Sequence, residues 1–212
     1  MNTLIGEMSY QELRNRFRAI WGGVAWPGKR SGFVCIVGME HKQHFDSGDL
    51  YVLDEYESLD LRQLVRQCGV LAVKYSIRPG EDYTRFIGDS KQDAASKFIQ
   101  EFNAEQHRDA ERFSLSSPPI REMEHLYSYM LPQIKELRSA ERRQLFLEDS
   151  TILSYLSEIE KSDLAELELG AYPAIEAIAF AVTELRRWAA IQDAERQTGA
   201  ELNDPNDRMN YY

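Results

Sequence analysis

The sequence is poor in cysteine and has no long apolar run, and both absences exclude classes of protein. Its 212 residues include two cysteines, Cys35 and Cys68, which fall in the apolar patterns of a strand and of a helix. This placement predicts buried free thiols rather than a disulfide, and it indicates a reducing compartment. No apolar run reaches the roughly 18 residues that a membrane-spanning helix needs, and the first residues lack the features of a signal peptide. We therefore expect a cytoplasmic protein without a membrane partner.

Basic residues are also in short supply. The chain has 25 lysines and arginines against 35 aspartates and glutamates, a formal net charge of −10. Tight binding to DNA depends largely on Lys and Arg that neutralise phosphates, so we expect any contact with DNA to be weak unless a metal ion or another subunit helps. Two basic groups, Lys29 with Arg30 and Arg138 with Arg142 and Arg143, either form a local phosphate-contacting patch or are solvated surface charges.

A nucleotide-binding loop is nearly present but lacks two of its parts. The residues from Gly23 to Arg30 resemble the pattern G-x-x-x-x-G-K-[ST], yet Arg30 stands where a hydroxyl must reach magnesium. The residues that follow, 33–37, read as a strand, whereas the loop should open a helix whose N-terminus faces the phosphates. We therefore predict no nucleotide cofactor.

The first half of the chain has a clear order of strands and helices. Residues 21–39 read as a strand, a glycine-rich turn and a second strand, and residues 50–57 read as a third. A helix with one apolar stripe begins near Asp60, and a short strand over 85–88 ends at Asp89. This order resembles the ribonuclease-H-like (RNase H-like) nuclease fold, an α/β fold with a mixed sheet. It implies three antiparallel neighbouring strands, then alternating helices and strands, with the fourth strand parallel to the first and helices flanking the sheet.

The length fits one domain with appendages. We expect an N-terminal arm or short helix over 1–18, an RNase H-like domain over 19–190 and a polar, loosely ordered C-terminal tail over 191–212. Within the domain, the patterns next predict a helix from about 94 to 103, a loop over 114–119 and a helix over 121–140 that Pro132 interrupts. They then predict a strand over 143–148, a short helix over 152–159 and a closing helix that Pro173 opens.

The closing segment Tyr172-Pro-Ala-Ile-Glu-Ala-Ile-Ala-Phe-Ala181, together with the strand order, resembles the nuclease domain of phage terminase large subunits. In that family three carboxylates bind a pair of divalent metals, Mg²⁺ or Mn²⁺. The resemblance implies that Asp89 is the second ligand and Glu176 the third, and that both are catalytic. The first is missing: Ala25 stands where the family has an aspartate, and a methyl group cannot ligate a hard cation.

Other acids are candidates for the missing ligand. Asp149, at the end of the predicted strand over 143–148, is the one that we include in the predicted metal site, beside Asp89 and Glu176. Glu40, Glu148 and the pair Asp54 and Glu55 also remain candidates. A structural interpretation stays open as well, because Asp89 and Glu176 both stand at helix starts, where carboxylates cap N–H groups and interact with the helix dipole.

The resemblance implies a phage or prophage protein, located in the host cell, that is linked to DNA packaging or processing. If active, it is a divalent-metal-dependent DNA endonuclease, but the gap at Ala25 predicts impaired or absent cleavage. One alternative is a non-catalytic interaction module on the same fold that binds other phage packaging proteins. Another is a resolvase-type enzyme, which needs a complete carboxylate cluster.

Overall fold

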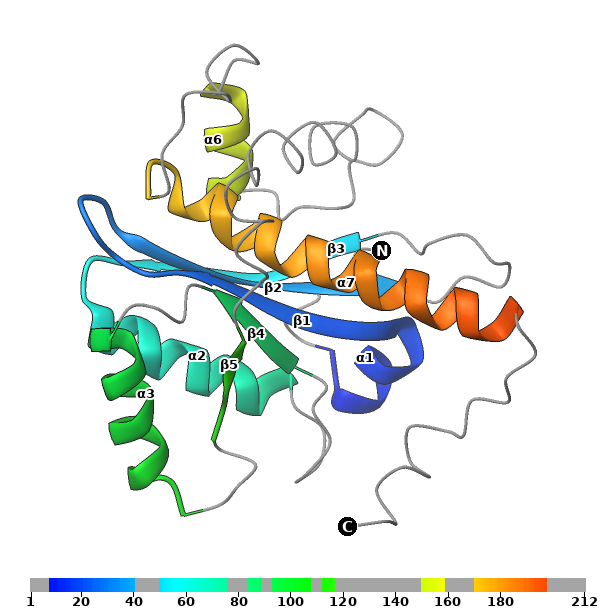
Figure 1. Ribbon diagram of the computed structural model, residues 1–212, viewed down its shortest axis with the longest axis horizontal. Helices are drawn as coiled ribbons and strands as arrows, with labels where there is room; N and C mark the ends of the chain where they lie inside the picture. Colours follow the sequence, from blue (N-terminus) through cyan, green and yellow to red (C-terminus); the bar gives the residue numbers. More distant parts are fainter. Residues whose placement is uncertain are drawn as a thin grey trace.

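The computed structural model describes residues 8–40, 50–75, 84–88, 93–107, 112–116, 150–158 and 170–197. They form a five-stranded mixed sheet with helices on both faces (Figure 1). The strands are β1 (Phe17–Ala25), β2 (Gly32–Glu40), β3 (Leu50–Ser58), β4 (Thr84–Gly88) and β5 (Leu115–Ser116), and the sheet order is β3-β2-β1-β4-β5. The general α/β class predicted from the sequence is therefore confirmed.

The strand pairing also agrees with the prediction for the first four strands. β1 pairs with β2 and β2 with β3, both antiparallel, while β4 lies parallel to β1 on its other side. The connection from β3 to β4 contains helix α2 (Leu61–Tyr75), as a parallel crossover requires. Gly23 pairs with Cys35 on one side and with Ile87 on the other, so the middle of β1 is the centre of the sheet.

Each face of the sheet has its own apolar core. One core packs against α6 (Thr151–Glu158) and α7 (Pro173–Gln197), and the other against α2, α3 (Asp93–Glu105) and α1 (Tyr10–Arg16). Figure 1 shows α7 running across the first face, with α2 and α3 on the opposite side. Cys35 is buried in the first core and Cys68 in the second; both are free thiols, as predicted, and burial raises the pKa of each.

Local signals explain where the helices begin. Ser9 and Glu12 form a capping box at α1, in which the Ser9 backbone N–H donates to the Glu12 carboxylate at 2.7 Å. Asp60 caps α2 as predicted, because its Oδ1 accepts the Arg62 N–H at 2.8 Å. The predicted apolar stripe of α2 is buried, and it comprises Leu64, Val65, Cys68, Leu71 and Ala72. No helix among the described residues is long and apolar enough to cross a membrane.

Two segments differ from the prediction. Residues 114–119 were expected to be a loop, but Leu115 and Ser116 pair with β4 as β5. The cause lies in α3: the Asn103 side-chain amide donates to the Phe113 carbonyl at 2.9 Å and accepts the Phe113 N–H at 3.1 Å. This double contact holds the chain beside β4. The predicted helix over 121–140 and the predicted strand over 143–148 lie outside the described residues.

The closing helix is longer than expected. α7 continues to Gln197, past the predicted start of the polar tail at 191. Near its C-terminal end, Asp193 accepts from the Arg18 guanidinium at 3.2 Å, and the same guanidinium lies over the Trp188 ring at 5.0 Å. These contacts fix the polar end of the helix to the start of β1. The segment has no apolar periodicity, so its sequence did not predict that the helix continues. Residues 198–212 lie outside the described part of the chain.

Candidate functional site

Of the three predicted metal ligands, only Glu176 lies among the described residues. Asp89 and Asp149 lie outside them. Their immediate neighbours in the chain are described, however, because Gly88 ends β4 and Ser150 precedes α6. The structure therefore shows Glu176 directly and shows the residues that adjoin the other two acids.

The ends of β1 and β4 lie side by side. Gly88 pairs with Val24 in the parallel register, and a Cβ added to Gly88 would lie 2.5 Å from the Val24 carbonyl oxygen. Ala25 is the next residue and the last of β1. The carboxyl ends of parallel strands are where open α/β sheets commonly bind ligands, so this edge is the candidate site.

Ala25 itself is covered. Its exposed fraction is 4 %, and it belongs to the apolar core between the sheet and α7. Two residues earlier, a Cβ added to Gly23 would lie 1.7 Å from the Ala177 carbonyl oxygen and 3.1 Å from the Ala181 nitrogen. The backbone of α7 therefore rests directly on β1. The position at which the sequence resemblance implies a first carboxylate thus holds a methyl group inside a packed helix–sheet contact.

Glu176 lies in the first turn of α7 and has an exposed fraction of 5 %. Its Oε1 accepts the backbone N–H of Gly170 at 2.5 Å, and its own N–H donates to the Tyr172 carbonyl at 3.0 Å. Gly170 has a φ of +91°, which favours glycine because it has no Cβ. The carboxylate thus closes the turn that leads into α7. This is the structural role at a helix start that the sequence allowed beside the metal-ligand role.

On β3, Asp54 and Glu55 each lie on the face of the sheet opposite to the face that simple alternation predicts. A bulge leaves Leu53 unpaired, because Ile36 pairs with Asp54 and Val37 with Val52. Side chains alternate between the faces of a strand, and one extra residue reverses that alternation beyond the bulge. Leu53 and Asp54 therefore both face α2, while Glu55 faces the side of α6 and α7.

Glu55 is the acid that the bulge brings to the α6 and α7 face. It pairs with Cys35, which in turn pairs with Gly23 of β1. Its Oε2 accepts the Thr151 N–H at 3.1 Å, and its carboxylate also accepts from the Ser150 hydroxyl and the Ile152 N–H. The other oxygen, Oε1, is buried without a hydrogen-bond partner among the described residues.

The electrostatics of Glu55 follow from this environment. Burial raises the pKa of its carboxyl group, the hydrogen bonds from α6 act against that rise, and the nearby charge of Asp54 adds to it. Glu55 therefore fixes the N-terminus of α6 to the sheet. The residue immediately before Ser150 is Asp149, so Glu55 anchors the chain next to one predicted ligand. The sequence analysis missed this role, although Ser150 ahead of an apolar period is a signal of a helix start.

The other two acids considered on β2 and β3 have structural partners elsewhere. Glu40 accepts from Arg16 at 3.2 Å and from the Tyr51 hydroxyl at 3.1 Å. Asp54 accepts from Lys74 at 2.6 Å and from the Tyr75 hydroxyl at 3.2 Å, on the face of α2. Neither lies beside Ala25, so Glu55 is the described candidate that shares its face. Glu148 lies outside the described residues.

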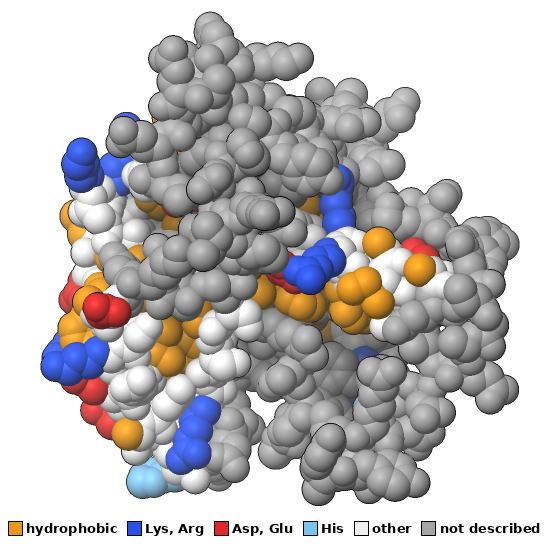
Figure 2. Space-filling view, in the orientation of Figure 1, with side chains coloured by type: hydrophobic (Ala, Val, Ile, Leu, Met, Phe, Trp, Pro, Cys, Tyr) orange, Lys and Arg blue, Asp and Glu red, His pale blue; other side chains and the backbone are white. Residues whose placement is uncertain are grey.

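Two basic residues lie in the turn between β1 and β2, at the same end of the sheet. The Arg30 guanidinium lies over the Tyr172 ring at 5.0 Å, close to the start of α7, and Lys29 is exposed. Figure 2 shows Lys and Arg side chains over this end of the sheet. The other predicted basic group, at residues 138–143, lies outside the described chain. This turn is therefore the described surface best suited to contact a phosphate.

The part of the chain that the structure describes holds no group of three or more His, Cys, Asp or Glu side chains placed to bind a metal ion. A comparison with protein-family models and a comparison with curated proteins both find no match.

Proposed function

We propose that this chain is an RNase H-like domain related to the nuclease domain of phage terminase large subunits, linked to DNA packaging or processing, with impaired or absent DNA cleavage. The proposal is supported by the sheet order β3-β2-β1-β4-β5, by the parallel pairing of β4 with β1 and by a long closing helix on one face. It is also supported by the start of that helix, which carries Glu176 near the end of β1.

The burial of Ala25 under α7 is the observation that carries the loss of activity. The resemblance implies a pair of Mg²⁺ or Mn²⁺ ions, which need several oxygen ligands and a shared carboxylate. The described residues do not supply that set: Ala25 offers no oxygen, and the Glu176 carboxylate already accepts the Gly170 N–H. Glu55 is the remaining described acid on this face, and its carboxylate already accepts the Thr151 N–H. We therefore infer that the pair of ions lacks its bridging ligand.

A cleavage assay tests this proposal. Purified protein and the Glu176→Gln variant, prepared in parallel, are incubated with linear and supercoiled DNA in Mg²⁺ and in Mn²⁺. We expect no difference between the two proteins, because the metal pair is incomplete before the substitution. Strong cleavage by the unmodified protein that Glu176→Gln removes would overturn the proposal and show an active nuclease.

The second candidate is a non-catalytic module that binds other phage packaging proteins. It is favoured by the net charge of −10, which opposes binding to a polyphosphate. Fluorescence anisotropy with duplex DNA at low salt separates the two. Weak binding that Lys29→Glu reduces more than Lys97→Glu supports a DNA contact at the β1–β2 turn, since Lys97 is an exposed lysine on α3, away from this turn. No binding even at low salt favours the module.

A further inference from the structure

A groove lies between α2 and α3, on the side of the sheet opposite α7. Gly69 of α2 makes the close contact between the two helices, because a Cβ added there would lie 2.1 Å from the Phe102 ring. Beside this contact the groove remains open, and its walls include Arg62 and Arg66 from α2 and Phe98, Glu101, Phe102 and Glu105 from α3. It is separate from the candidate site at the end of β1.

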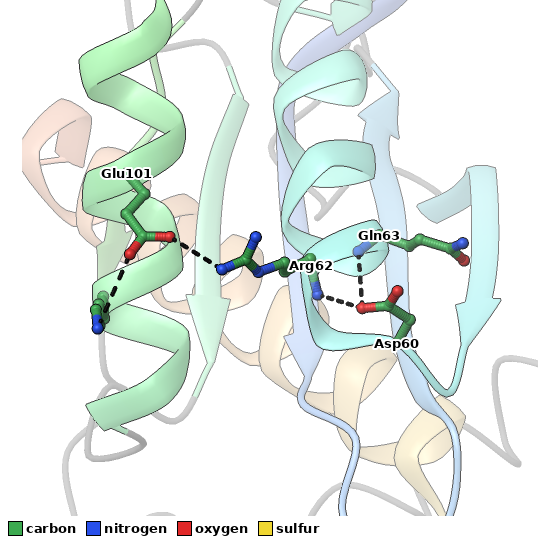
Figure 3. Close-up of polar contacts among 5 residues, drawn as sticks. Asp60, Arg62, Gln63 and Glu101 are labelled. Carbon is green, nitrogen blue, oxygen red and sulfur yellow. Dashed lines mark hydrogen bonds and ion pairs between the residues drawn. The ribbon is translucent and has the colours of Figure 1, made fainter.

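The charges in this groove are sorted by helix. The α2 wall carries arginines and the α3 wall carries glutamates, with two phenylalanine rings between them. Arg62 reaches across to Glu101, with a nitrogen-to-oxygen distance of 3.6 Å (Figure 3). Its guanidinium also lies over the Phe98 ring, at 4.6 Å from the ring centroid. One opposite-charge pair within the chain thus already spans the groove.

The next pair along the groove is not formed. Arg66 and Glu105 are both exposed and line the groove, and among the described residues neither has an ion-pair partner. Each therefore offers a charge to a partner. Arg66 lies four residues after Arg62 and four before Val70, so these side chains follow one face of α2. Val70 and Val73 are 56 % and 49 % exposed, which adds apolar surface next to the charges.

A partner with one sign of charge does not suit this groove. An acidic peptide would face the α3 glutamates, and a basic one would face the α2 arginines, so each would gain on one wall and lose on the other. A partner must present both signs in the reverse order. A second copy related by a two-fold axis that runs parallel to the groove meets this requirement, because that axis places the α2 wall of each copy against the α3 wall of the other.

We propose that the groove between α2 and α3 is a homodimer interface, in which Arg66 of each copy pairs with Glu105 of the second copy. Phe98, Phe102, Val70 and Val73 then supply apolar contact between the two copies. Charged contacts at the rim of an interface fix its register and are screened by salt, so this dimer is weaker at high ionic strength.

Sedimentation velocity from micromolar to millimolar protein tests the proposal. We expect a concentration-dependent dimer at low salt that weakens at high salt. Arg66→Glu and Glu105→Arg each place like charges together twice across the two-fold axis, so each should weaken the dimer about tenfold or more. An equimolar mixture of the two variants restores both contacts, and should form a heterodimer about as well as the unmodified chain forms its homodimer.

Arg187→Glu is the matched control, because it reverses an exposed charge on α7, which packs on the opposite face of the sheet from the groove. Circular dichroism of each variant establishes that it is folded. A monomer at every concentration overturns the proposal. A dimer that neither charge reversal weakens also overturns it. So does a mixture of the two variants that fails to form a heterodimer, because each result places any dimer contact on another surface.

Discussion

Replacing Gly23 by alanine perturbs the closest approach between α7 and the sheet. The added Cβ would lie 1.7 Å from the Ala177 carbonyl oxygen and 2.7 Å from its carbonyl carbon. Both atoms belong to the backbone of a 25-residue helix, so no side-chain rotation can relieve the clash. Either α7 must lift from β1, or both elements must bend.

The expected cost is large. Inserting a methyl-sized group into a well-packed core typically costs about 1–3 kcal/mol, and the cost is greatest when the neighbours cannot move. We expect Gly23→Ala to lower the free energy of unfolding by about 3 kcal/mol. That is a considerable share of the roughly 5–15 kcal/mol by which domains of this kind are stable.

Urea unfolding followed by circular dichroism measures this loss. The matched control is Gly28→Ala in the β1–β2 turn, where a Cβ would meet nothing within 4 Å. Gly28 has no positive φ, so its change should lie within about 1 kcal/mol and can be stabilising through the unfolded state. If Gly23→Ala and Gly28→Ala unfold at the same urea concentration, α7 does not rest on β1 as described.

Two further predictions concern the acids of the candidate site. The folded-state pKa of Glu55 is raised by burial, so the protein should lose stability relative to Glu55→Gln as pH rises from the ordinary glutamate range towards neutrality. Unfolding curves at several pH values measure this difference, and a constant difference would contradict the assignment. Ala25→Asp should lower stability because it buries a carboxylate. Added Mn²⁺ should recover part of that loss, so it should raise the melting temperature of Ala25→Asp more than that of the unmodified protein. On an RNase H-like fold, Ala25→Asp should also give DNA cleavage that a second substitution, Asp89→Asn, abolishes. If Mn²⁺ raises the melting temperature of Ala25→Asp no more than that of the unmodified protein, the result favours the interaction module.

The order of the first four strands could be predicted because it depends on strong local signals. The turn after Ala25 is rich in glycine, and the helix from Leu61 carries a clear apolar stripe between two strand patterns. A short turn imposes an antiparallel neighbour, and a helical crossover imposes a parallel one. Both rules act through chain geometry alone, so the sequence was sufficient.

The faces of the acids on β3 could not be predicted in the same way. Alternation starting from Val52 places Asp54 towards α7 and Glu55 towards α2, and the bulge at Leu53 reverses both assignments. A bulge depends on how a strand fits its neighbour and leaves no fixed mark in the sequence. The candidate that shares the face of Ala25 was therefore identifiable only from the paired strands.

Side-chain contacts from outside each segment explain the other differences. β5 forms because Asn103 holds Phe113 beside β4, and α7 extends to Gln197 with Asp193 paired to Arg18. In both cases one polar side chain outside the segment, ten residues away for Asn103 and 175 residues away for Arg18, decides the conformation of a segment without periodic apolar residues. Local propensity is a weak guide in such segments, because tertiary contacts override it.

The fold and the chemistry of this domain depend on different residues. The backbone contact at Gly23 positions the start of α7, which carries Glu176, and the Glu55 carboxylate positions the start of α6, which follows Asp149 in the chain. Neither anchor uses an oxygen at position 25. A chain with alanine there can keep both anchors and lose the shared ligand of a metal pair. The packing around Ala25 is therefore compatible with the proposed impairment of cleavage.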